Sequence, residues 1–354
     1  MKEDVRLELF SVAELRDWLL HNVSVRGLSE KLMSKTRAYS IVNNPYARDD
    51  MYVISAIFVG DEVAAYTAVF PEKLARPDRF VYWDTTLYVA PQYEGRGYAA
   101  IVIGQICELY GADYFDHGAA VASVQNFKFL GIPVSRVPQY LLGPKAFAKT
   151  MMGALLRRIW DVKDLINGIQ LRKKYNESRS LNYVIDYVNF VDDATYRFIE
   201  EHSQGDVFLR TKDTFNWMLR YPFVVESPLV ARTIPENSFS AYIESYAMGA
   251  AKVVVDGKIV GFYIIVVGGD QLIVKYLYYN PAFANEVFGS IFEHVYKLNI
   301  KKLVTYSLEL ADYLISLRFF HRKTKYGASF THPEDLDFDG SLTLQAGDGD
   351  LFSL

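Results

Sequence analysis

The feature that most constrains the fold of this chain is an internal repeat with an offset near 190 residues. Residues 52–70 contain two apolar, β-rich runs separated by a turn at Gly60, which predicts an antiparallel hairpin. Residues 252–267 repeat the pattern around Gly257. A repeat of this length indicates two copies of one folding unit in tandem.

The repeat continues beyond the hairpins. Leu-Tyr-Val-Ala-Pro at 87–91 matches Leu-Tyr-Tyr-Asn-Pro at 277–281, and a helix-length segment, a short strand and another helix follow each. Upstream, a strand and a helix begin near Val5 and again near Val184. We therefore predict an α/β protein (an α+β mixed sheet) formed by a tandem duplication.

The length of 354 residues, about half of them hydrophobic, is enough for two domains with separate cores. We expect a first domain at 1–143, a basic helical connector at 144–183 and a second, degenerate domain at 184–354. The connector has nine Lys or Arg against three Asp or Glu between 144 and 179. Its basic face is either a solvated helix surface or a contact for an anionic surface or nucleotide phosphates.

Composition excludes several function classes. The net charge of -4 gives no basic field for nucleic acid, and Cys107 is the single cysteine, so no intrachain disulfide forms. No Cys/His metal pattern and no N-terminal secretion signal is present, so we expect no metal and a cytoplasmic protein. The longest apolar runs, such as 259–267, are about half the roughly 20 residues of a membrane helix. Oligomeric state is not fixed by the sequence, although edge strands can join chains.

A glycine loop carries the chemistry. Gln92, Gly95 and Gly97 lie between a β-rich run and a helical run at 98–109. Unpaired N–H groups at such a helix start, together with the helix dipole, bind phosphate, and glycines allow close approach. A plain strand-to-helix turn is one alternative. A Rossmann oxidoreductase is another, which is disfavoured because this strand ends an antiparallel meander.

With the hairpin before it and the helix, strand and short helix after it, this motif resembles the Gcn5-related N-acetyltransferases (GNAT) over roughly 1–143. The resemblance implies two tandem GNAT-like domains, with acetyl-CoA or another acyl-CoA as cosubstrate. In such proteins loop amides hold the pyrophosphate, and the preceding strand splays from its neighbour to pair with the pantetheine arm. The cofactor-binding residues implied are Leu87, Tyr88, Val89, Gln92, Tyr93, Glu94, Gly95, Arg96, Gly97, Tyr98 and Ala99.

Candidates for catalysis are three residues on two strands. Acyl transfer to an amine needs a base, and Asp84 stands where some family members place theirs, although it also fits a strand-end carboxylate. Asp116 and His117 are adjacent on the next strand, so they point to opposite faces and at most one faces the cleft. Structural roles remain open for both.

The sequence departs from the family at two positions. Phe127 replaces the tyrosine that commonly protonates the thiolate, and Ala120 replaces an asparagine before it. Cys107 reads as a small buried hydrophobe and not as a nucleophile.

The second copy lacks glycine in the matching loop at 280–286, so we expect it to have lost the cofactor site and to form a wall of the acceptor cleft. Its aromatic residues at 276–279 fit core packing. The acidic glycine segment at 347–350 fits a tail turn better than a calcium loop.

The predicted function is an N-acyltransferase, in the first place an N-acetyltransferase, that transfers an acyl group from acyl-CoA to a primary amine in a ternary complex. The acceptor and the acyl length cannot be read from the sequence. The alternative is a non-catalytic module that binds or senses acyl-CoA, which the residue at 127 and the degenerate copy permit.

Overall fold

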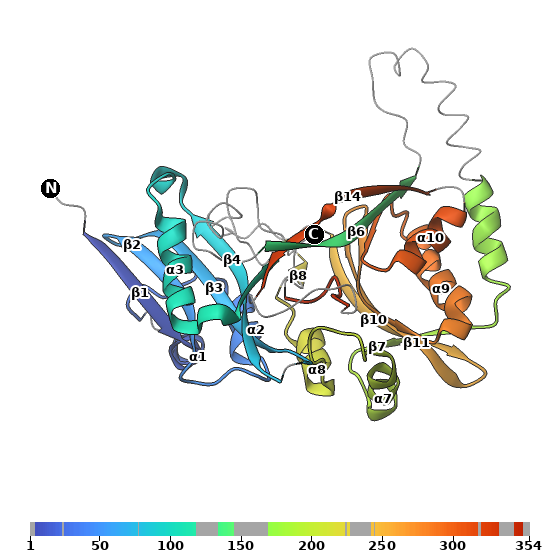
Figure 1. The fold of residues 1–354 in the computed structure, drawn as a ribbon, viewed down its shortest axis with the longest axis horizontal. Helices are drawn as coiled ribbons and strands as arrows, with labels where there is room; N and C mark the ends of the chain where they lie inside the picture. The colour runs from blue at the N-terminus through green and yellow to red at the C-terminus, as the bar shows by residue number, and fades with distance from the viewer. Residues whose placement is uncertain are drawn as a thin grey trace, which may run out of the picture. The chain divides into compact units, whose positions relative to one another are not determined.

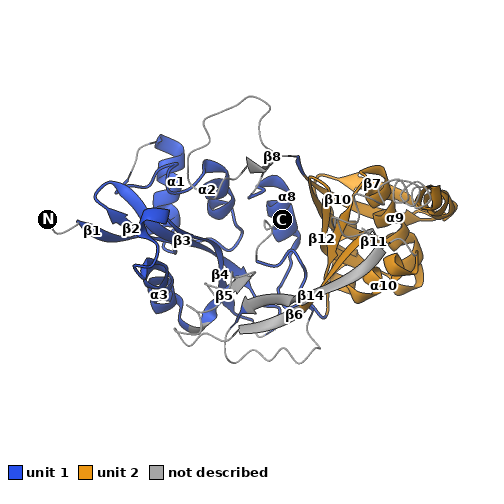
Figure 2. Cartoon of the chain, turned by 90° about the horizontal axis from the view of Figure 1, so that it is seen from above, with its two compact units in different colours: residues 1–137, 205–246, 328–353 blue, residues 138–204, 247–327, 354 orange. Residues whose placement is uncertain are grey.

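The computed structural model describes residues 4–22, 25–76, 78–117, 134–144, 169–223, 225–226, 242–243, 245–317, 320–332 and 343–349 (Figure 1). The chain divides into two compact units (Figure 2). Unit 1 comprises residues 1–137, 205–246 and 328–353, and unit 2 comprises residues 138–204, 247–327 and 354. Both units are therefore discontinuous in sequence.

Unit 1 is built on a mixed sheet in the order β1-β2-β3-β4-β5-β14. The strands are β1 (Val5–Ser11), β2 (Tyr52–Val59), β3 (Glu62–Lys73), β4 (Phe80–Val89), β5 (Tyr114–His117) and β14 (Phe320–Thr331), whose last residues enter this unit. Strands β1 to β4 are antiparallel to their neighbours, β5 is parallel to β4, and the end of β14 is antiparallel to β5.

Helices cover both faces of this sheet. On one face, Val69 of β3 packs with Ile103 of α3 (Tyr98–Tyr110). On the other, the ring of Phe70 lies 5.8 Å from that of Trp217 in α8 (Lys212–Arg220), and Trp217 Nε1 donates to the carbonyl of Ser40 in α2 (Lys35–Val42) at 2.8 Å. Because neighbouring strand residues point to opposite faces, α3 lies on the side of the sheet away from α2 and α8 (Figure 2).

The N-terminal helix α1 (Val12–His21) shows why these helices begin where they do. Ser11 accepts a hydrogen bond from the Glu14 N–H at 3.3 Å, and Glu14 accepts one from the Ser11 N–H at 2.9 Å. This capping box satisfies two N–H groups that the helix itself leaves unpaired. Side-chain caps also start α2 and α8.

Unit 2 repeats the plan with strands in the order β6-β13-β12-β11-β10-β7. The strands are β6 (Val134–Pro144), β7 (Val184–Val188), β10 (Tyr246–Val255), β11 (Lys258–Gly268), β12 (Gln271–Tyr279) and β13 (Lys302–Thr305). Helices α9 (Ala284–Lys297) and α10 (Leu308–Ser316) pack on one face, and α7 (Asp193–His202) packs on the other (Figure 1). A short parallel pair, β8 (Val225–Glu226) and β9 (Tyr242–Ile243), belongs to unit 1.

The two halves of the sequence exchange strands. β5, from the first half, pairs with β14 near the C-terminus, and β13, from the second half, pairs with β6 of the first. The two compact units are therefore not the continuous domains predicted with boundaries at 143 and 183. That division stays a prediction about the repeat in the sequence.

The predicted hairpins are confirmed by the registers of β2 with β3 and by the β10-β11 turn at Asp256-Gly257. Each copy also has a bulge that the hydrophobic pattern does not show. The register of β3 with β4 skips Thr85, and the register of β11 with β12 skips Lys275, 190 residues later. The two copies therefore share a bulge at equivalent positions of equivalent strands.

Several other expectations concern the second half. Residues 169–178 are helical, and most of the predicted connector, at 145–168, lies outside the described residues, so the connector stays a prediction. Tyr276 and Tyr278 are buried, and Tyr279 packs on Phe288 at 4.9 Å, so these aromatics are core residues. Residues 346–349 form a turn, although Asp348 within it has a structural role described below.

Candidate functional site

The glycine loop joins β4 to α3 through the short helix η1 (Pro91–Tyr93). Tyr93 is buried, its N–H donates to the Ala90 carbonyl at 2.8 Å, and its hydroxyl donates to Glu62 at 3.0 Å. Gly95 and Gly97 have φ of 76° and 78°, which L side chains rarely adopt. A Cβ at either position meets no atom within 4 Å, so the requirement for glycine is conformational and the space above both is open.

Helix α3 begins without any side-chain cap and without an acidic residue in its first turn. Its first intrahelical hydrogen bond runs from the Ile101 N–H to the Gly97 carbonyl at 3.2 Å. The N–H groups of residues 98–100 therefore have no acceptor within the helix. Helices α1, α2, α7, α8 and α10 all have a Ser, Thr or Asp cap. An uncapped, acid-free N-terminus next to two left-handed glycines can bind an anion.

The other predicted loop residues surround this helix start. Gln92, Glu94 and Arg96 are exposed, and the Arg96 guanidinium lies 5.1 Å from the centre of the Tyr93 ring. Tyr98 and Ala99, in the first turn of α3, are half-buried. Their backbone N–H groups, and not their side chains, are what the geometry offers to a phosphate.

The matching loop of unit 2 is built differently. The Asn280 side chain accepts from the Ala282 N–H at 3.0 Å and thereby occupies a donor of η3 (Pro281–Phe283). Glu286 then places a carboxylate in the first turn of α9. Both features disfavour a phosphate there, which supports the expectation that the second copy has lost the cofactor loop.

Strand β4 has an edge that β5 does not cover. The two strands pair in parallel only at Tyr82, Trp83 and Asp84, whereas β4 continues along β3 to Val89. In the part of the chain that the structure describes, the segment after Asp84 is therefore paired on one side only. Its last residues, Leu87, Tyr88 and Val89, are half-buried and lead directly to the glycine loop.

Asp84 marks the point where this separation begins. It is only 4% exposed, and its Oδ2 accepts hydrogen bonds from Thr67 at 2.8 Å and Tyr114 at 2.5 Å. Its Oδ1 accepts from the Thr86 N–H at 3.0 Å, across the bulged Thr85. Three donors stabilise the carboxylate charge, and burial prevents it from meeting a dissolved amine directly.

The other catalytic candidates lie on β5. Asp116 is opposite Asp84 in the parallel register and opposite Thr331 of β14, and His117 is opposite Phe330. The register thus places the two aspartates in one row across the sheet. Positions 120 and 127, where the sequence departs from the family, lie outside the described residues.

Cys107 lies on α3 and is half-buried. Burial, reinforced by the charge of Asp84, raises the pKa of its thiol to about 12. At pH 8 only about one molecule in ten thousand then has the reactive thiolate.

We expect the folded protein to resist iodoacetamide at pH 8, while the protein in guanidinium is alkylated at its cysteine. Mass spectrometry of the intact chain measures both. Equal rates in the two states would contradict the protected thiol. Resistance also means that thiol-release assays report CoA and not Cys107.

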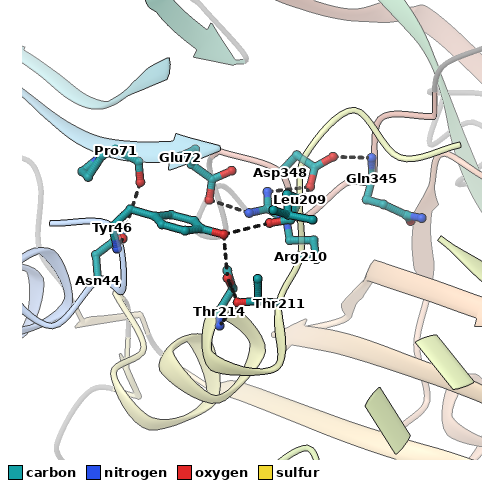
Figure 3. Close-up of polar contacts among 10 residues, drawn as sticks. All are labelled: Asn44, Tyr46, Pro71, Glu72, Leu209, Arg210, Thr211, Thr214, Gln345 and Asp348. Atoms are coloured by element: carbon teal, nitrogen blue, oxygen red, sulfur yellow. Dashed lines mark hydrogen bonds and ion pairs between the residues drawn. The ribbon is translucent and has the colours of Figure 1, made fainter. Parts of the chain in front are cut away.

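A buried ionic cluster in unit 1 was not anticipated from the sequence (Figure 3). Arg210 donates to Glu72 of β3 at 2.5 Å and, through Nε and Nη2, to Asp348 at 3.2 and 2.7 Å. All three side chains are about 1% exposed. Tyr46 lies nearby and donates to the Leu209 carbonyl at 3.2 Å. The cluster binds the 205–211 and 343–349 segments to β3.

Sequence reasoning missed Thr67, Tyr114 and Thr86 around Asp84. All three lie on strands that the hydrophobic pattern predicts, but their convergence depends on the register and on the bulge. In the described residues, no group of His, Cys, Asp or Glu side chains is arranged to hold a metal ion. In the same residues, no helix is both long and apolar enough to cross a membrane.

N-myristoyltransferase from Saccharomyces cerevisiae, solved with bound myristoyl-CoA and inhibitors, is similar to this chain with a TM-score of 0.54 at 13% identity. The match covers 100% of this chain and 88% of that one. A probable N-acyltransferase of unknown function from Enterococcus faecalis V583 has a TM-score of 0.50 at 8% identity, with 93% and 73% covered. A tandem GNAT protein from the clavulanic acid biosynthesis pathway has a TM-score of 0.49 at 11% identity, with 94% and 100% covered.

The fold of this chain is similar to that of N-myristoyltransferase and of the Enterococcus faecalis protein. This confirms the α/β class with a mixed sheet and the resemblance drawn from the glycine loop. No protein-family model matches the sequence, and no curated protein matches it. At these identities the similarity shows the fold alone, and the reaction has to be argued from the site.

Proposed function

We propose that unit 1 binds an acyl-CoA and transfers its acyl group to a primary amine. The observation that carries this proposal is the continuity of two features on one strand. In the described residues, the part of β4 after Asp84 is paired with β3 but not with β5. It leads to a loop and a helix N-terminus that can bind an anion. An extended arm with a pyrophosphate at one end and a thioester at the other matches this arrangement.

The proposed cofactor contacts follow from this placement. The N–H groups around Gly95, Gly97 and the first turn of α3 hold the pyrophosphate. Leu87 to Val89 pair with the pantetheine arm along the open edge of β4, which places the thioester near the bulge at Thr85. In the reaction the amine nitrogen attacks the thioester carbonyl carbon, the carbon–sulfur bond breaks, and the thiolate takes a proton.

The proposal covers both short and long acyl chains. N-myristoyltransferase, solved with bound myristoyl-CoA, is similar in fold to this chain, and this similarity supports testing a long acyl group beside acetyl. The acceptor is proposed only as a primary amine.

Asp84 is our candidate for the base that removes the amine proton. Because its carboxylate is buried, the proton has to reach it through a bonded hydroxyl, and Tyr114 or Thr67 can supply that relay. Asp116 and His117 remain the alternatives on the next strand.

Replacing Asp84→Asn is expected to lower turnover about 100-fold or more, because an amide cannot accept the proton. Acyl-CoA affinity should be unchanged, since the loop and the β4 edge keep their geometry. Thiol release measures turnover, and calorimetry measures affinity. An unaltered rate would remove Asp84 from the mechanism.

A second candidate function, an acyl-CoA-binding module without turnover, is favoured by the burial and full bonding of Asp84. The two functions differ in one result. A module binds acyl-CoA but releases no thiol with any amine of a broad panel, whereas the enzyme releases it in proportion to product.

A further inference from the structure

The hydroxyl of Thr86 on β4 takes part in no hydrogen bond with the residues that the structure describes. The residue is 4% exposed, and in the described structure its Oγ1 is shielded from water and has no hydrogen-bond partner. A buried hydroxyl without a partner costs free energy, and native proteins pair most such groups. An unpaired buried group in a native protein therefore calls for an explanation, and a contact with a bound molecule is one.

The bulge at Thr85 determines where this hydroxyl lies. Asp84 is opposite Val69 on β3, whereas Thr86 is opposite Ala68, so the two side chains lie on opposite faces although they are two residues apart. Asp84 is on the α3 side. Thr86 is therefore on the side that α3 does not cover.

Thr86 also stands at the proposed thioester end of the open β4 edge. Its N–H is held by Asp84, which fixes the backbone at this point. Between Thr86 and Val89 the strand runs roughly 10 Å toward the glycine loop, at about 3.3 Å per residue. A cofactor arm that runs along this edge from the loop brings its reactive end to Thr86.

We infer that Thr86 Oγ1 donates a hydrogen bond to the carbonyl oxygen of the bound acyl thioester. This inference rests on the proposed function and deepens it, because the contact would let the protein distinguish acyl-CoA from free CoA. The thioester carbonyl is a good acceptor, whereas the thiol of free CoA is a weak one. Thr86 then contacts the reacting group and polarises it for attack.

The test compares ligands that differ only in the carbonyl. Acetyl-CoA is titrated beside S-ethyl-CoA, a thioether of the same length without the carbonyl, and beside free CoA; myristoyl-CoA and S-tetradecyl-CoA form the long-chain pair. The variants are Thr86→Val, which keeps the shape, and Thr86→Ser, which keeps the hydroxyl. Thr67→Val is the matched control, because its buried hydroxyl has a partner in Asp84.

We expect Thr86→Val to weaken acyl-CoA binding about fivefold, the typical value of one neutral hydrogen bond, and to leave the thioether and free CoA unchanged. Thr86→Ser, which keeps the hydroxyl, should bind acyl-CoA more tightly than the thioether, as the wild-type protein is expected to do. The melting temperature of Thr86→Val should stay level or rise, because no protein bond is lost, whereas that of Thr67→Val should fall.

Three results would overturn the inference. Equal weakening of all ligands, or no weakening of any, would show that the hydroxyl does not recognise the carbonyl. A lower melting temperature for Thr86→Val would show that the hydroxyl has a structural role. If wild-type protein binds acyl-CoA and thioether equally, only the Thr86 contact fails; if it binds no CoA at all, the proposed function fails as well.

Discussion

Replacing Arg210→Met is expected to lower the free energy of unfolding of unit 1 by about 3–5 kcal/mol, the usual cost of removing one partner from a buried ion pair. Glu72 and Asp348 would keep their burial and lose the cation between them (Figure 3). The 343–349 segment would also lose its bond to β3. Guanidinium unfolding followed by tryptophan fluorescence measures this, since Trp18, Trp83 and Trp217 all lie in unit 1.

The pH dependence of this variant has a definite sign. In the wild-type protein, burial raises the pKa of Glu72 above its usual value despite the opposing charge of Arg210. A carboxyl group whose pKa is higher in the folded than in the unfolded protein stabilises the fold at a pH below its unfolded-state pKa. That stabilisation is lost as the pH rises through its folded-state pKa. Without Arg210 the pKa of Glu72 should rise further. The difference in unfolding free energy between Arg210→Met and the wild-type protein should therefore become smaller at acidic pH.

A triple variant provides the control. Combining Arg210→Met with Glu72→Gln and Asp348→Asn removes every charge of the cluster, and part of the lost stability should return because no buried carboxylate is left without its cation. If Arg210→Met unfolds with the wild-type midpoint at neutral pH, the cluster does not hold the C-terminal segment.

Replacing Gly97→Glu should weaken acyl-CoA binding on the order of 100-fold or more, equivalent to about 2.7 kcal/mol. The carboxylate would stand at the helix start where the pyrophosphate is proposed to lie, and like charges repel there. The fold should survive, because a Cβ at this position meets no atom within 4 Å. The left-handed backbone alone costs roughly 1–2 kcal/mol of stability.

Gly257→Glu is the matched control for that backbone cost. Gly257 has φ of 76° and equally open surroundings, but it lies in the β10-β11 turn of unit 2. Both variants should lose similar stability in thermal unfolding, and only Gly97→Glu should lose the stabilisation that acyl-CoA confers. Unchanged affinity in a folded Gly97→Glu protein would remove the glycine loop from the site.

The elements of the fold follow from local pattern, and their association does not. The hairpins, the helix at 98–110 and the repeat are readable because residues with the same role recur at a fixed offset. The pairing of β5 with β14, and of β13 with β6, joins segments far apart in the chain, where no periodicity specifies the partner. The discontinuous units arise from this exchange.

The same distinction applies to the site. The glycine loop is a local motif, so its positive φ angles and uncapped helix follow from the sequence. Asp84 stands out as a carboxylate in a strand, but its burial depends on Thr67 and Tyr114, which reach it from two other strands. The bulge at Thr85 changes which face Thr86 occupies, and an extra residue in a ladder leaves no mark on an apolar run.

Arg210 illustrates a further limit. In the sequence it precedes Thr211, the cap of α8, and nothing near it suggests an ion pair. Its partners are more than 130 residues away on either side. A buried charge is recognised only once its partners are placed, since an isolated one would not remain buried.

Calorimetric titration of the wild-type protein with acetyl-CoA and myristoyl-CoA, with NADH as the control nucleotide, decides whether unit 1 binds acyl-CoA. We predict one site per chain for at least one of these thioesters, because only one of the two matching loops is proposed to bind a pyrophosphate. We predict no heat of binding from NADH, which has a pyrophosphate but lacks the pantetheine arm proposed to pair with β4. If acetyl-CoA, myristoyl-CoA and free CoA all fail to bind, or if NADH binds tightly, unit 1 is not an acyl-CoA-binding domain.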